Sequence, residues 1–259
     1  MTEMIALATQ LSGLGQDMLW TGFLVFLRVG AAMALMPAFG EQAVPQRVKL
    51  VLALAFTAVV APAVSGDLTA LEPGTATPLI TEVIAGFIIG AGLRFFITAL
   101  QIAGAIIAQA TTLSQLFAGT GPEPQPAIAN LLVMAGLALA VMAGLHVHVA
   151  ELLILSYDPL PAGQFPGAAD TADWGLFQIS RAFSLAFAMA APFVAASLIY
   201  NVAIGVINRA MPTLMVSFIG APALALGGLL LLAIVTPLAL AVWIGALQGY
   251  IAAPFSVVP

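Results

Sequence analysis

Long apolar runs separated by short polar connections dominate the pattern of this chain. Six of the runs reach about 20 residues, the length that an α-helix needs to cross the hydrocarbon core of a bilayer. They predict helices over roughly 17–37, 45–64, 81–113, 127–155, 174–208 and 212–250. The pattern therefore predicts an all-α membrane protein with about six long hydrophobic helices.

Three of these predicted helices, 81–113, 174–208 and 212–250, are longer than one crossing requires. Each either bends or extends beyond the membrane. Pro192 and Pro237 are the expected kink points, because a proline inside a helix removes a backbone donor and clashes with the preceding turn. Pro45, in contrast, suits the first turn of its helix.

The polar segment 109–126 interrupts the apolar pattern near the middle of the chain. Its glycines and prolines exclude a continuous helix: Gly119, Gly121, Pro122, Pro124 and Pro126. Leu113, Leu116 and Phe117 make its first half apolar enough to pack. We expect an irregular segment held inside an assembly of helices. The alternative is an exposed cytoplasmic loop.

Composition supports a membrane protein and excludes several other classes. The chain of 259 residues is 62% hydrophobic and 7% charged, whereas soluble domains carry about 25% charged residues. It has no cysteine, so a disulfide framework and a thiolate metal site are excluded. A net charge of −5 with six basic residues argues against nucleic-acid binding. The N-terminal residues have no basic region, so we expect no cleavable signal peptide.

Charge is distributed unequally among the connections between the predicted helices. Arg47 and Lys49 lie between the first two helices, and Arg209 lies between the last two. The other ends carry only acidic residues, namely Glu3, Asp17, Asp67, Glu72, Asp158, Asp170 and Asp173. The positive-inside rule then places both termini outside and the basic connections in the cytoplasm. The central segment, with Glu123 as its one charge, falls on the cytoplasmic side.

Small residues recur at helical spacing in two places. Gly86 and Gly90 form a GxxxG pair, and Gly136, Ala140 and Gly144 form a ladder. Such faces allow close contact between helices in an apolar setting. The contacts either pack the chain against itself or bind another subunit.

Arg28 and Arg94 each fall about a dozen residues into a predicted helix, and we see no acidic partner for them at matching depth. An arginine at the bilayer centre costs roughly 2.5 kcal/mol or more. Such residues should face protein, a wet cavity or a region outside the hydrocarbon. Arg94 also opens a polar and small-residue stripe along one helix face, formed by Arg94, Thr98, Gln101, Ala105, Gln109 and Thr112. This stripe either lines a water-filled path or packs against a polar face of another subunit.

His146, His148 and Glu151 suggest a metal site, but the two histidines are two positions apart and point about 200° apart on a helix. Only His148 and Glu151 share a face, so hydrogen-bonded packing is favoured over metal binding. No catalytic triad, HExxH, P-loop or dinucleotide loop is present in the sequence. The sequence therefore predicts no enzyme, no metal and no cofactor.

Three stretches, in this order, resemble the FliR family of flagellar biosynthesis proteins, which is related to the SctT export proteins of injectisomes. They are 26–55 (arginine in an apolar helix, then MPxFG and VPxRVK), 145–157 (a histidine-containing helix) and 191–222 (NxxxG, RxxP and FxIGxP). The family-signature positions are Arg28, Pro37, Gly40, Pro45, Arg47, Asn201, Gly205, Arg209, Pro212, Gly220 and Pro222.

The resemblance implies a subunit of a type III protein export gate in the bacterial inner membrane and the flagellar basal body. FliP-like and FliQ-like subunits are the implied partners, together with FlhB-like and FlhA-like proteins and exported unfolded proteins. Residues 1–170 are expected to resemble a FliP subunit, and 171–259 a FliQ-like helical hairpin. The counterpart of 109–126 in the family is thought to plug the closed pore, which implicates Leu113, Leu116, Phe117, Gly119 and Gly121.

Two other functions remain open at this point. One is the same role in an injectisome. The other is a small-molecule transporter with broken helices, which the internal prolines would also suit, although the sequence shows no duplicated half with paired interruptions.

Overall fold

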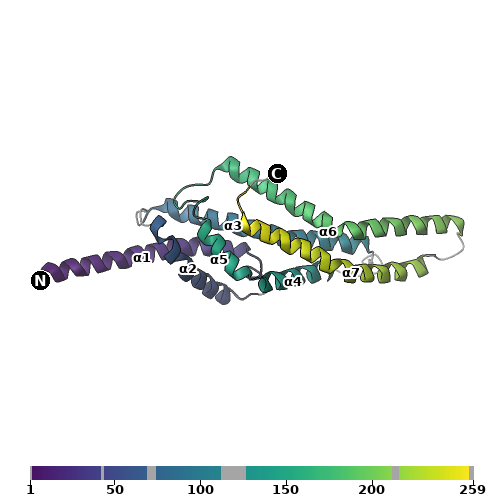
Figure 1. The fold of residues 1–259 in the computed structure, drawn as a ribbon, viewed down its shortest axis with the longest axis horizontal. Helices are drawn as coiled ribbons and strands as arrows, with labels where there is room; N and C mark the ends of the chain where they lie inside the picture. The colour runs from purple at the N-terminus through teal and green to yellow at the C-terminus, as the bar shows by residue number, and fades with distance from the viewer. Residues whose placement is uncertain (1, 42–43, 69–73, 112–126, 212–215, 257–259) are drawn as a thin grey trace. The chain divides into compact units, whose positions relative to one another are not determined.

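The computed structural model describes residues 2–41, 44–68, 74–111, 127–211 and 216–256, with side chains left out for 2–14, 67 and 216–225. Every element in these ranges is an α-helix (Figure 1). In chain order they are α1 Thr2–Leu35, α2 Gln46–Leu68, α3 Ala76–Ala110, α4 Ala127–Met142, α5 Leu145–Leu155, α6 Ala168–Ala210 and α7 Val216–Ala252. The all-α prediction is confirmed.

Five of the described helices are long and apolar enough to cross a membrane, or six if the broken pair α4 and α5 counts as one span. The chain is thus a membrane protein, as its composition predicts. Two helices begin earlier than expected, α1 at Thr2 and α3 at Ala76.

The predicted helix 127–155 is wrong as one continuous element. Gly144 has a left-handed backbone with φ 82°, and it separates α4 from α5. A side chain is strained in that conformation, which glycine adopts at no steric cost. The amides of Val147 and His148 donate to the Gly144 carbonyl, so the glycine also starts α5. It is therefore a helix boundary and not the third member of a packing ladder.

Prolines and charges mark the other helices in ways that fit their chemistry. Pro45 lies just before α2, and its carbonyl accepts from the amide of Lys49 at 3.2 Å, as predicted for a helix start. Pro192 lies inside the continuous helix α6, and the kinks expected there and at Pro237 stay predictions. Helix α6 has Asp170 in its first turn and Arg209 in its last, the arrangement that complements the helix dipole.

Contacts divide the chain into two compact units. The first consists of 1–94, 143–177 and 250–259, and the second of 95–142 and 178–249. The resemblance of 1–170 and 171–259 to two other kinds of subunit is a separate matter and stays a prediction.

Candidate functional site

A buried polar cluster lies at the centre of the first unit, around Arg28 of α1. Its guanidinium meets the Glu82 carboxylate of α3 through two parallel hydrogen bonds, from Nε to Oε2 and from Nη2 to Oε1, each 2.8 Å long. Arg28 is 1% exposed and Glu82 is fully buried. Paired in this way, a planar guanidinium and a carboxylate form one of the stronger ion pairs available to a protein.

The segment at the end of α5 completes the cluster. Nη1 of Arg28 donates to Ser156 Oγ at 3.0 Å, and Nη2 donates to the Leu160 carbonyl at 2.7 Å. The Tyr157 ring lies 3.5 Å from the guanidinium carbon, and its hydroxyl donates to Glu82 Oε2 at 3.0 Å. Every nitrogen of the guanidinium thus has an acceptor, and the cluster ties α1, α3 and α5 together.

This cluster corrects the expectation that Arg28 and Arg94 have no acidic partner at matching depth. Glu82 is that partner for Arg28, and Arg94 Nη1 lies 2.8 Å from Glu41 Oε1. Helix α3 begins at Ala76, so Glu82 is more than a turn inside it and not at its first residues. Glu41 reaches Arg94 from the connection after α1. Burial of Arg28 inside protein is the outcome that its predicted cost in lipid favours.

The Gly86 and Gly90 pair makes an intramolecular contact. A side chain at Gly86 would overlap the Arg28 carbonyl, and one at Gly90 would come within 2.5 Å of the Ala32 carbonyl. Both obstacles belong to the backbone of α1, so they cannot move aside cheaply. The first of the two alternatives for this GxxxG pair, packing of the chain against itself, is the one found, and it holds α3 close enough to α1 for the Arg28–Glu82 pair.

The signature residues after α1 form a tight turn with a structural basis. Ala38 has a positive φ of 65°, and the Gly40 amide donates to the Met36 carbonyl at 2.8 Å. A Cβ on Gly40 would come within 2.7 Å of two backbone carbonyls of α1. The Lys49 ammonium donates to the Gly40 carbonyl at 2.9 Å. Gly40 is thus fixed by close approach to the end of α1, while Arg47 is exposed.

In the second unit, small residues also allow close packing. A Cβ on Gly104 would overlap Ala129 of α4, and one on Gly136 would come within 2.5 Å of Leu100. Trp243 of α7 is 1% exposed, and its indole donates to the Phe96 carbonyl at 2.8 Å. Helices α3, α4 and α7 therefore meet through these contacts.

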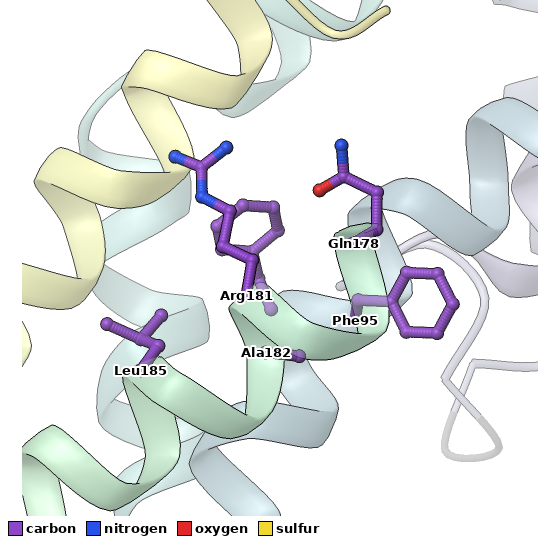
Figure 2. A pocket seen from close by; sticks show the side chains of 6 residues that line it. Phe95, Gln178, Arg181, Ala182 and Leu185 are labelled. Carbon is purple, nitrogen blue, oxygen red and sulfur yellow. The ribbon is translucent and has the colours of Figure 1, made fainter. Parts of the chain in front are cut away.

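Arg181 of α6 is a helix-embedded arginine that the sequence analysis did not single out. Its Nη2 donates to the Ala246 carbonyl at 3.1 Å, and its guanidinium carbon lies 5.6 Å from the Phe96 ring centre. It lines a small pocket with Phe95, Phe96, Gln178, Ala182 and Leu185 (Figure 2). The signal that could have revealed it is a single charge preceding a long uncharged run.

The predicted polar stripe on α3 is only partly described. Gln101 and Gln109 are exposed, Thr98 is half-buried, and Arg94 pairs with Glu41. Thr112 lies outside the described residues. The two roles considered for the stripe, a water-filled path or a subunit contact, stay predictions.

Other predicted positions fall in less informative places. The plug candidates Leu113, Leu116, Phe117, Gly119 and Gly121 lie outside the described residues, and so does Pro212. Asn201, Gly205 and Arg209 are exposed on α6, and Gly220 and Pro222 belong to the part of α7 given as backbone alone. His148 Nδ1 lies 3.3 Å from Glu151 Oε2 on the exposed side of α5, so these two share a face as predicted.

Comparison with known proteins agrees with this arrangement. Residues 19–250 match the model of the family described as bacterial export proteins, family 1. The chain is similar to the flagellar biosynthetic protein FliR of Caulobacter vibrioides, at 37% identity over 82% of this chain and 86% of that protein. It is also similar to FliR of Escherichia coli, at 30% identity over 83% and 84% of the two chains. FliR of Bacillus subtilis is 26% identical over 77% and 79%. The chain belongs to the FliR family of bacterial export proteins.

Proposed function

We propose that this protein is an integral inner-membrane subunit of the flagellar type III protein export gate. The observation that carries the proposal is the family match over 19–250, together with relatives of similar length that are named flagellar biosynthetic protein FliR. In this role the chain performs no chemistry of its own. It forms part of a conduit through which other proteins leave the cell, and flagellum assembly requires it.

Exposed apolar side chains support a role inside a larger assembly. Along α6 and α7, residues such as Leu198, Val202, Val206, Leu230 and Leu238 are each at least 60% exposed. In a membrane protein these side chains face lipid or other subunits. FliP-like and FliQ-like proteins are the partners we propose, with FlhB-like and FlhA-like proteins bound at the same gate.

Copurification in a mild detergent, followed by mass measurement of the complex, tests this proposal. The full chain should be recovered with FliP-like and FliQ-like subunits, and it should aggregate when it is produced without them. A monodisperse, thermally stable monomer would contradict the gate function. Neighbouring genes for FliQ-like and FlhB-like proteins would favour the gate over a small-molecule transporter, and loss of flagella on deletion would favour the flagellar system over an injectisome.

The proposed orientation has its own test, which the absence of cysteine makes simple. A single cysteine at Asp170 should react with an impermeant maleimide in intact spheroplasts, and one at Arg209 should react only after lysis. The reverse pattern would overturn the orientation without affecting the family.

The plug function proposed for 109–126 rests on the sequence alone. Replacement of Leu113, Leu116 and Phe117 by alanine should increase leakage of ions through the assembled complex, because apolar side chains seal a constriction by excluding water. A complex that assembles and stays tight would leave this segment as a connection between helices.

A further inference from the structure

Arg181 differs from the other two helix-embedded arginines in its partners. Arg28 and Arg94 each pair with a carboxylate at 2.8 Å. Arg181 has no carboxylate within 4.0 Å in the described part of the chain. The Ala246 carbonyl and the Phe96 ring attract its guanidinium without neutralising it. The charge of Arg181 is therefore uncompensated by the chain as described.

Gln178 provides a second donor beside it. The two residues are three positions apart on α6, a spacing that makes them neighbours on the helix surface. Figure 2 shows the Gln178 amide and the Arg181 guanidinium extending to the same side of α6. Gln178 is 2% exposed and lines the pocket, yet its amide makes no hydrogen bond to any described residue. A buried amide without a partner indicates an acceptor that comes from outside the chain.

The volume and chemistry of the pocket limit what that acceptor can be. Its internal space is about 10 Å³, which is enough for a single oxygen-sized group. The donors are one guanidinium and one amide, so an anionic oxygen is the group that fits them. Nε and Nη1 of Arg181 are not used in any bond to a described residue.

The position of Arg181 along α6 identifies the source of this anion. The next charged residue is Arg209, and the difference 209 − 181 gives 28 positions without an intervening charge. At about 1.5 Å per residue, a straight helix separates the two arginines by about 42 Å. A bilayer is about 40–45 Å thick when its headgroup regions are included. The two arginines therefore match the two phosphate layers of one membrane.

We propose that Gln178 and Arg181 bind the phosphate group of a phospholipid, in the leaflet opposite Arg209. The guanidinium neutralises the phosphate charge and the amide donates to one of its oxygens. Phe95 and Phe96 shield the bound oxygens on one side. The inference requires insertion of α6 in the membrane and does not depend on the export function.

Lipid titration of the full chain, purified with any subunits that accompany it, tests the site. Delipidated protein is titrated with dioleoyl phosphatidylglycerol, and bound lipid is counted by native mass spectrometry. Arg181→Gln should weaken the tightest binding step about tenfold, since it removes a charge-assisted hydrogen bond. Gln178→Leu should weaken it about threefold. Arg47→Gln is the matched control, because Arg47 is exposed on α2, and it should leave this step unchanged.

Further measurements keep the test decisive if Arg181→Gln fails to fold. Arg181→Lys retains the charge and should bind with intermediate affinity. Dioleoylglycerol has the same acyl chains without a phosphate and should not compete. Equal loss in Arg181→Gln and Arg47→Gln would overturn the site. So would competition by inorganic phosphate as effective as the lipid, or a carboxylate of another subunit found against Arg181 in the assembled complex.

Discussion

The Arg28 cluster and the second half of α6 differ in where their side chains find partners. Arg28, Glu82 and Ser156 are almost completely buried, and each is hydrogen-bonded within the chain. Leu198 and Val202 on α6 are 64% and 60% exposed. The first region is complete within one polypeptide, whereas the second requires lipid or another subunit. Stability and assembly are thus encoded in separate parts of the chain, and mutations can distinguish them.

Breaking the Arg28–Glu82 pair should have the largest effect. Glu82→Gln retains the shape and removes the charge, so Arg28 is left buried without a counterion. We expect the free energy of unfolding to fall by about 3–5 kcal/mol, measured by denaturant titration in mixed micelles. The double variant Arg28→Met with Glu82→Leu should recover part of this loss, because neither charge then remains. A double variant no better than Glu82→Gln would contradict the ion-pair explanation.

Equal truncations in the two regions would sharpen the comparison. Leu153 is fully buried and Leu198 is 64% exposed. Leu153→Ala should lower the free energy of unfolding by about 2–5 kcal/mol through the cavity it leaves. Leu198→Ala should change it by less than about 0.5 kcal/mol and instead reduce recovery of the copurified complex. Similar losses of stability would mean that the hairpin is packed within the chain.

Close approach of α1 and α3 should be sensitive to a single methyl group. Gly86→Ala places a Cβ against the Arg28 carbonyl and should cost about 1–3 kcal/mol of unfolding free energy. Gly30→Ala on α1 is the control, because nothing lies within 4 Å of that Cβ. Alanine raises helix propensity, so the control should gain up to about 1 kcal/mol. Equal behaviour of the two variants would place this face away from the contact.

The smallest effect is expected at the Arg94–Glu41 pair. Its side chains are 35% and 28% exposed, so water screens the charges. Glu41→Gln should cost no more than about 1 kcal/mol, and the difference from the unmodified chain should shrink as salt is raised. A loss as large as that of Glu82→Gln would show that this pair is dehydrated in the folded protein.

Much of the fold could be predicted from the sequence because apolar runs of membrane-spanning length leave few alternatives. Pro45 marks the start of α2 at the level of a single residue. The break at Gly144 was missed, because a glycine in a small-residue ladder and a glycine with a left-handed backbone look alike in sequence. Only the environment of the backbone separates these two uses.

The candidate site was predicted less completely. Arg28 was recognised as costly in lipid, but its partner Glu82 lies 54 positions away, and no local pattern links the two. Glu41 was read as part of a connection, although it turns back to Arg94. Arg181 was overlooked among the apolar residues of its helix. Long-range pairs of this kind depend on tertiary packing, which one sequence does not display.

The spacing of the Arg28 partners along the chain has a consequence for biosynthesis. Ribosomes add about 5–20 residues per second, so Glu82 emerges roughly 3–11 s after Arg28. Leu160, which is 132 positions later, follows after roughly 7–26 s. During that interval α1 carries a cation without its final acceptors. The insertion machinery must therefore hold this first segment in a hydrated or protein-lined place until α3 and α5 arrive, and the order of translation sets the earliest moment at which the unit can close.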